Sequence, residues 1–225
     1  MKVINFNVER LITKSKLKSI IEIIESFNAD IIILTETNSE LIKLNPIYFS
    51  EHSQRLSKNH DNVNFHRDGE NRVSIYSKYP IRKRIITTDK FTNLAVEIDT
   101  IYGTLIIYST IIGVFGYNID KVRFIQDFEN QIVDFEKIFK GNNVCLIGDL
   151  NISISGYIYP SKKYREKLNE IIKKYNLDNS TGEIEGNIDH ILISKKFIGK
   201  LKLKVEKFNL NKKLSDHIGI CLTLK

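Results

Sequence analysis

DIIILTET, at residues 30–37, places four consecutive apolar residues directly before a threonine and a glutamate. A short apolar run bounded by polar residues is typical of a strand buried on both faces. The preceding segment carries apolar side chains at helical spacing, with Ser15 as its expected cap and Asn28 as its end; they are Ile20, Ile23, Ile24 and Phe27. The pattern therefore predicts a helix leading into a buried strand, with Glu36 at the carboxyl end of that strand.

The rest of the chain alternates strand-like and helix-like segments. Strands are expected at residues 3–8, 73–77, 84–88, 93–99, 104–110, 144–148, 188–194, 200–208 and 217–224, and helices at 120–140 and 161–175. The strands between residues 73 and 110 follow one another across short turns, which favours an antiparallel meander. With neither a repeat nor a linker, we expect one α/β domain over residues 1–225, with packed sheets flanked by helices.

Residues 37–71 are polar and irregular, and they predict a long surface loop with at most one edge strand. This loop includes the basic side chains Arg55, Lys58 and Arg67, and Arg72 follows it. These cations could contact phosphates, and a solvated loop surface explains them equally well. Arg55 and Arg72 are our candidates for substrate binding, together with Tyr117 from a later loop.

Composition bounds the class of protein. The chain has 225 residues and a net charge of +7, from 34 Lys and Arg against 27 Asp and Glu. This excess favours a polyanionic partner, but abundant Ile and Asn beside Lys would also follow from an AT-rich coding sequence. Cys145 and Cys221 each lie in an apolar strand-like run, so we expect buried reduced thiols. With no secretory leader or membrane span evident, we expect a cytoplasmic protein, and nothing indicates an obligate protein partner.

Polar residues recur where the predicted strands end. Six short motifs carry them: NFNVE at 5–9, DIIILTET at 30–37, RVSIYSKYPI at 72–81, GDLN at 148–151, NIDHI at 187–191 and SDH at 215–217. Loops at the carboxyl ends of strands are where ligands collect in α/β sheets. Each motif alone fits a turn or a helix cap, but their common placement predicts a single site.

In this order and spacing, the six motifs resemble the endonuclease/exonuclease/phosphatase superfamily, which includes exonuclease III, deoxyribonuclease I and the apurinic endonucleases. The resemblance covers nearly the whole chain. It implies a four-layered α/β sandwich, with two mixed β-sheets packed face to face and helices outside. It also implies hydrolysis of a phosphodiester by in-line attack of water, assisted by Mg²⁺ or Mn²⁺.

The resemblance assigns a role to each candidate residue. Glu36 would be the principal metal ligand, with Glu9 and Asn7 completing the shell and Asp216 reaching the metal from the other side. Asp149 would orient or deprotonate the attacking water, and Asn151 would donate to a phosphate oxygen. Asp189 would hold the imidazole of His217, so that the protonated ring stabilises charge on the scissile phosphate. The catalytic candidates are therefore Asn7, Asp149, Asn151, Asp189 and His217.

The sequence departs from the family pattern at one strand end. Many members place a phosphate-contacting His or Tyr there, whereas this chain has Thr110 and Ile111. Tyr108 has the wrong parity to replace it, and Tyr117 could do so from the following loop. We expect His190, beside Asp189 on a strand, to point to the opposite face and to be structural.

Three functions remain open from the sequence. The first is a nuclease acting on DNA or RNA, which the charge and the basic loop favour. The second is a phosphatase or phosphodiesterase on a small or lipid phosphate ester, for which residues 111–117 would be the membrane-docking hairpin. The third is a non-catalytic nucleic-acid-binding relative, which predicts loss of carboxylates that this sequence retains.

Overall fold

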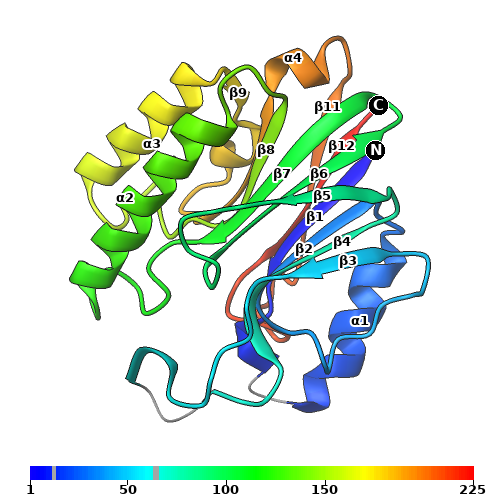
Figure 1. Ribbon diagram of the computed structural model, residues 1–225, viewed down its shortest axis with the longest axis vertical. Coiled ribbons are helices and arrows are strands. Elements are labelled where there is room, and N and C mark those ends of the chain that lie inside the picture. The colour runs from blue at the N-terminus through cyan, green and yellow to red at the C-terminus, as the bar shows by residue number, and fades with distance from the viewer. Residues whose placement is uncertain (12–13, 63–65) are drawn as a thin grey trace.

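The computed structural model describes residues 1–11, 14–62 and 66–225 and consists of two six-stranded sheets packed face to face (Figure 1). The first sheet has the strand order β11-β12-β1-β2-β4-β3, and the second has the order β5-β6-β7-β8-β10-β9. Each sheet mixes parallel and antiparallel pairs. The expected four-layered α/β sandwich is confirmed.

The first sheet is built around two parallel strands, β1 (Lys2–Asn7) and β2 (Ile31–Asn38), which are joined by helix α1 (Leu17–Ser26). The remaining strands pair antiparallel on either side; they are β3 (Phe49–His52), β4 (Glu70–Ser77), β11 (Leu203–Phe208) and β12 (Gly219–Leu224). Strands β1 and β2 therefore end at the same edge, which brings Asn7 and Glu36 together.

The second sheet pairs β7 (Gly103–Ile111) in parallel with β8 (Val144–Asp149), and β8 runs antiparallel to β10 (Asp189–Ser194). Its other strands are β5 (Ile81–Ile85), β6 (Asn93–Thr100) and the two-residue β9 (Leu177–Asp178). In the β8–β10 register, Asp149 lies directly opposite Asp189. The pairing alone therefore places these two carboxylates side by side.

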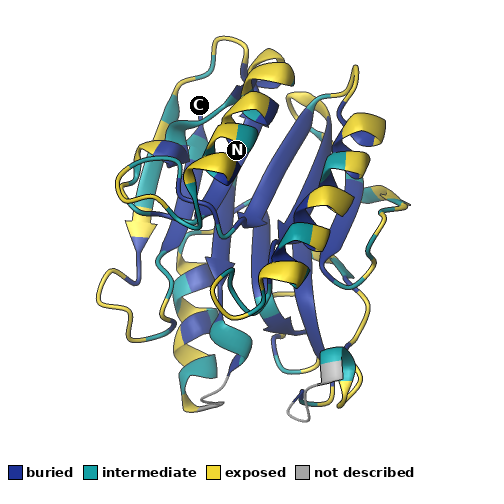
Figure 2. Cartoon of the chain, turned by 90° about the vertical axis from the view of Figure 1, so that its left-hand side faces the viewer, coloured by how far each residue is buried: buried dark blue, intermediate teal, exposed yellow. Residues whose placement is uncertain are grey.

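Helices cover the two outer faces. Helix α1 packs on the first sheet, whereas α2 (Lys121–Ile138) and α3 (Lys162–Lys174) cover the second (Figure 1). The short segments are α4 (Lys195–Ile198) and the 3-10 turns Glu9–Leu11, Lys14–Lys16, His60–Asn62 and Ser180–Glu183. Figure 2 shows the inner strands buried between helices whose outer faces are exposed.

Side-chain alternation in β2 explains why the layers form. Ile31 and Ile33 point into the core between the sheets, whereas Ile32 and Leu34 pack under α1 with Ile24. All four strand residues are fully buried. A continuous apolar run is what a strand covered on both faces requires. The two cysteines are buried free thiols, as expected.

Three local expectations were wrong. The strand at 73–77 does not join a meander, because β4 belongs to the first sheet and the chain crosses to the second sheet before β5. Ser15 does not cap α1, whose N-cap is Lys16 and has no side-chain cap hydrogen bond. The strand expected at 84–88 is β5, which ends at Ile85.

The segment 37–71 contains the single edge strand that was allowed for it, β3, but its residues 63–65 lie outside the part of the chain that the structure describes. Strand β9 and helix α4 had not been expected. Within the described ranges, none of the helices has the length and apolar character needed to cross a membrane.

Candidate active site

The carboxyl ends of β1, β2 and β8 meet the amino end of β10 where the two sheets face each other, and a buried amide holds them together. The Asn5 side chain, on β1, donates to the backbone oxygen of Gly148 at 3.0 Å and to that of His190 at 3.3 Å. Asn5 is completely buried. Because it spans from one sheet to the other, it fixes the ends of β8 and β10 against the end of β1.

Asn7 links the two carboxylates that come from different sheets. Its Nδ2 lies 3.2 Å from Oε1 of Glu36 and 3.1 Å from Oδ2 of Asp149. Its Oδ1 accepts from the backbone amide of Glu9 at 2.9 Å. The side chain of Asn7 therefore sets the separation of Glu36 and Asp149 and shapes the turn that follows β1.

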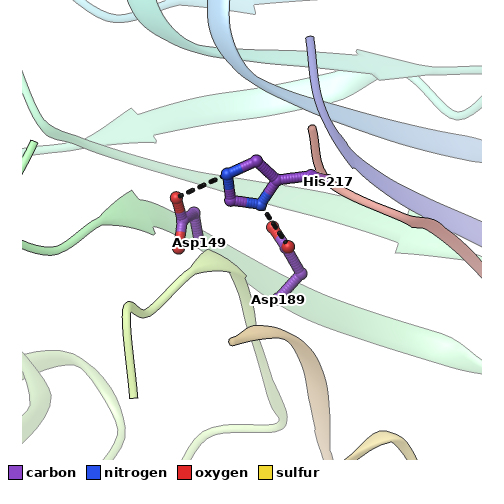
Figure 3. Close-up of side chains that lie close together, drawn as sticks. All are labelled: Asp149, Asp189 and His217. Carbon is purple, nitrogen blue, oxygen red and sulfur yellow. Dashed lines mark hydrogen bonds and ion pairs between the residues drawn. The ribbon is translucent and has the colours of Figure 1, made fainter. Parts of the chain in front are cut away.

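The imidazole of His217 lies between two aspartates of the second sheet (Figure 3). Its Nδ1 is 2.7 Å from Oδ2 of Asp189, and its Nε2 is 4.0 Å from Oδ2 of Asp149. Asp149 and Asp189 are each 1% exposed. A carboxylate on Nδ1 fixes the ring orientation and directs Nε2 toward Asp149 and the open side of the site.

Burial and charge perturb the acid–base behaviour of this cluster. Although burial opposes its charged form, the carboxylates of Asp189, Asp149 and Asp216 raise the pKa of His217 to about 11. Burial, and then the neighbouring charge of Asp189, raises the pKa of Asp149. Burial also raises the pKa of Glu36, against a hydrogen bond from Asn7. At neutral pH the cluster therefore keeps a proton that isolated groups would release, and the ring is an imidazolium.

A loop held by Asn209 supports His217. The Nδ2 of Asn209 donates to the backbone oxygens of Ser215 and His217, at 2.9 and 2.7 Å. The hydroxyl of Ser215 accepts from the backbone amide of His217 at 3.1 Å. Sequence reasoning missed Asn209 and the bridging role of Asn5. Asn5 lies within the quoted NFNVE motif, whereas an asparagine six residues before Ser215 gives no recognisable signal.

The other expected site residues fall at the rim. Asn151, with φ of 48°, donates its backbone amide to Oδ1 of Asp149 at 3.0 Å and its Nδ2 to the oxygen of Ile112 at 2.9 Å. An amide nitrogen has two hydrogens, so one is left to donate to a ligand. Oε2 of Glu9 lies 3.8 Å from Nζ of Lys16. Asp216 is exposed, with Oδ1 3.7 Å from Nε2 of His217.

The three expected substrate contacts differ in their surroundings. Arg55 is 62% exposed and pairs with Glu40 at 2.6 Å. Arg72 is only 3% exposed and pairs with Asp61. The ring of Tyr117 is half-buried and packs edge-on against Phe124. Arg72 also lines a cavity with Glu36, a feature that the sequence does not reveal.

Two expectations about strand parity are confirmed. His190 is completely buried, and its Nε2 contacts the oxygen of Ile152 at 2.9 Å. The hydroxyl of Tyr108 donates to Asp134 under α2 at 2.8 Å. Thr110 is buried as well, with its hydroxyl 2.7 Å from Oδ1 of Asn93. The last two residues of β7, Thr110 and Ile111, are therefore both buried and place neither a histidine nor a tyrosine at the site.

The donor set suits a hard cation near Glu36. Asp149, Asp189 and His217 have ligand atoms within 4.8 Å of one another, but a protonated imidazole has no lone pair for a metal, and its Nδ1 is already used by Asp189. Glu36 instead presents a half-buried carboxylate, one oxygen of which is held by Nδ2 of Asn7. Carboxylate oxygens are ligands that Mg²⁺ and Mn²⁺ prefer. The residues present therefore fit such an ion at Glu36.

Two facing mixed sheets, with a buried Asp–His–Asp cluster and a cation-compatible glutamate at their common edge, define the class of phosphoester hydrolases. The family model of the Endonuclease/Exonuclease/phosphatase family matches residues 4–217. The chain belongs to this family. No curated protein matches it in sequence.

Solved structures share the fold over their full length. An AP endonuclease from Archaeoglobus fulgidus has a TM-score of 0.72 at 14% identity, covering 100% of this chain and 99% of that one. The 3'-5' exonuclease NExo from Neisseria meningitidis has a TM-score of 0.71 at 16% identity, covering 100% of both chains. The Neisseria 3' phosphatase NExo, bound to a product DNA hairpin, has a TM-score of 0.73 at 15% identity, with 100% and 99% covered.

Proposed function

We propose that this protein is a Mg²⁺- or Mn²⁺-dependent phosphodiesterase whose substrate is nucleic acid. The observation that carries the proposal is the cluster beside the Glu36 carboxylate in which His217 hydrogen-bonds Asp189 and lies 4.0 Å from Asp149. The cluster combines a carboxylate for water, a cationic donor for a phosphate oxygen and a site for a hard cation. Those are the groups that in-line hydrolysis of a phosphodiester needs.

Asp149 is the group that orients the attacking water and accepts its proton. Its raised pKa brings its proton affinity closer to neutral pH, where a general base works best. The imidazolium of His217, held by Asp189, donates to a non-bridging oxygen as negative charge develops there. The remaining amide hydrogen of Asn151 reaches the same phosphate. Burial of the cluster strengthens each of these interactions.

Glu36 would hold the metal ion, with Asn7 and Glu9 nearby and Asp216 on the opposite side. When bound, the ion supplies Lewis-acid stabilisation of charge on the phosphate. Asn7 holds the carboxylates of Glu36 and Asp149 in a fixed relation through its two hydrogen bonds. The base therefore stays aligned with the position where the phosphate is bound.

The choice of nucleic acid rests on the net charge of +7 and on neighbours described as nucleases and a DNA-bound phosphatase. For the lipid alternative, residues 111–117 would have to form an exposed apolar hairpin. Ile111 and Ile112 are instead buried, and Val114 and Phe115 line a cavity. This observation favours nucleic acid over a membrane-bound substrate.

A substrate panel tests the proposal. Plasmid DNA, single-stranded DNA, an abasic duplex, RNA and a bis-aryl phosphodiester are incubated with Mg²⁺, Mn²⁺ or EDTA, using the natural protein and Asp149→Ala. We expect metal-dependent cleavage of a nucleic acid that the variant lacks. Turnover of the aryl ester alone would replace nucleic acid by a small phosphodiester, and an absence of turnover from a folded protein would leave a non-catalytic relative.

A further inference from the structure

A cavity of about 110 Å³ opens beside Glu36. Its polar lining includes Arg10, Arg72 and Glu36, and its apolar lining includes Leu56, Val114 and Phe115. A cavity of roughly 150 Å³ holds a molecule the size of benzene. This one is smaller, so its size suits a group of a few heavy atoms better than a nucleoside.

Arg72 supplies this cavity with a buried cationic hydrogen-bond donor. It is 3% exposed, its Nη2 donates to Asp61, and its guanidinium lies 5.9 Å from the centroid of the Phe115 ring. Its Nη1 has no hydrogen-bond partner among residues 1–11, 14–62 and 66–225. A buried donor without an acceptor costs about 1–3 kcal/mol, and more when the group is charged. An acceptor supplied by a ligand removes that cost.

The guanidinium is held rigidly, which suits recognition of an oxyanion. Asp61 accepts from Arg72 and also from Nη1 of Arg123, at 2.6 Å, so one carboxylate ties β4 to α2. Two other polar lining groups already have partners: Arg10 donates to Glu70, and the Nδ2 of Asn71 donates to the oxygen of Val73 at 2.8 Å. Among the guanidinium and amide groups of the lining, the unpartnered Nη1 of Arg72 is a donor that remains for a ligand in this cavity.

We propose that this cavity binds a terminal phosphate monoester of the substrate, a phosphoryl group that is not the one cleaved. This proposal rests on the proposed function, because the cavity shares Glu36 with the candidate metal site. Guanidinium groups bind phosphate oxygens by charge-assisted hydrogen bonds. The small volume favours a terminal phosphate, since an internal one carries a sugar on each side and needs room for both.

Binding of inorganic phosphate tests the cavity without catalysis. Melting temperatures are measured in EDTA with increasing phosphate for the natural protein, Arg72→Gln, Val114→Phe, His217→Ala and the exposed control Arg82→Gln. Val114→Phe fills the cavity and leaves the Arg72–Asp61 pair in place, so it serves if Arg72→Gln does not fold. We expect a saturable rise in Tm for the natural protein, the control and His217→Ala, and none for the two cavity variants.

The proposal is overturned if phosphate still raises the Tm of Val114→Phe and Arg72→Gln, or if only His217→Ala loses the rise in Tm. Either result would place phosphate at the scissile site. A second experiment compares KM for oligonucleotides with 5'-phosphate, 3'-phosphate or hydroxyl ends. We expect one phosphorylated end to lower KM about ten- to hundredfold in the natural protein and in Arg82→Gln, and this preference to vanish in Val114→Phe.

Together, the two experiments test the cavity proposal and the proposed phosphodiesterase activity separately. Cleavage of nucleic acid with equal KM for all three ends, together with a phosphate response unaffected by the cavity variants, refutes the cavity proposal and leaves the phosphodiesterase intact. Phosphate binding that depends on Arg72, in a protein that cleaves no polymer, supports the cavity and refutes the nuclease.

Discussion

His217 is a residue whose charge the fold controls strongly. Its ring donates through Nδ1 to a buried carboxylate at 2.7 Å, and the surrounding acids raise its pKa to about 11. His190, which is completely buried, has the opposite behaviour, because burial lowers its pKa to about 4. The same residue type is thus cationic in the site, where Asp189, Asp149 and Asp216 together outweigh burial, and neutral in the core, where burial outweighs the charge of Asp189.

Replacing Asp189 by asparagine removes the charge behind His217. We expect the pKa of His217 to fall and kcat/KM to drop about 100-fold or more, because an ionised donor to the phosphate is lost. Titration of the histidine ring protons by NMR measures the first effect, and the signal of His190 provides an internal control. An unchanged titration of His217 in Asp189→Asn would contradict the proposed role of Asp189.

The raised pKa of His217 also predicts how stability depends on pH. Because the folded value, about 11, lies above the ordinary value of 6.5, the stabilisation is fully present below about pH 6.5 and is lost as pH rises through 11. The free energy of unfolding of the natural protein minus that of His217→Gln should therefore shrink by at most about 1.4 kcal/mol per pH unit. Urea unfolding in EDTA between pH 7 and 10 measures this difference in the free energy of unfolding. A difference that stays constant over this range would refute the prediction.

At the residue scale, sequence reasoning located the catalytic candidates but could not supply their surroundings. The GDLN motif ends a recognisable strand, and the NIDHI and SDH motifs lie at the start of two others, so their positions were predictable. The burial of Arg72 was not, because it depends on Asp61, a loop residue with φ of 57° that reaches the site through three-dimensional folding. From the sequence alone, a basic residue next to a polar loop is expected to be exposed to solvent.

At the scale of elements, the end of β8 depends on Gly148. Its φ is 141°, and a Cβ atom there would lie 1.9 Å from the backbone oxygen of Thr110 on β7. We expect Gly148→Ala to cost about 3 kcal/mol or more, because neither backbone can yield without breaking the β7–β8 pairing that positions Asp149. Thermal unfolding measures the loss.

Gly103→Ala is the matched control for that substitution. Its φ is also positive, at 112°, but a Cβ atom there meets no atom within 4 Å. It isolates the cost of the backbone conformation, which we expect to be about 1 kcal/mol. Equal destabilisation by the two alanines would show that the contact with Thr110 is unimportant.

Strand positions were predictable from apolar patterns, whereas the assignment of strands to sheets was not. Strands β4 and β6 both present apolar side chains to the core between the sheets, through residues such as Val73, Ile75, Leu94 and Val96. The alternation of apolar and polar side chains along a strand indicates which face of the strand is buried. The same alternation would occur whichever of the two sheets the strand joined. The crossover after β4 therefore could not be read from the pattern, and the expected meander was wrong.

At the scale of the whole molecule, the Asn5 amide connects the two sheets at the site. We propose that residues 1–225 form one domain that unfolds in a single transition, because the sheets share one core and this buried link. Asn5→Leu should lower the free energy of unfolding by about 1–3 kcal/mol. The exposed Asn118→Leu serves as the control and should change it little.

Far-UV and near-UV circular dichroism should report the same unfolding midpoint for the natural protein. Two separate midpoints would show that the sheets fold as independent units and would contradict the proposed single domain.

The central claim is that Asp149 and His217 hydrolyse a phosphodiester with the help of a divalent cation. The most direct test is the initial rate of nucleic-acid cleavage against Mg²⁺ concentration for the natural protein, Asp149→Asn, His217→Ala and the exposed control Asp99→Asn. We predict a saturable Mg²⁺ dependence in the natural protein and the control, and rates lowered about 100-fold or more in the other two. Cleavage that persists in EDTA, or at the natural rate in a folded Asp149→Asn, would contradict the account.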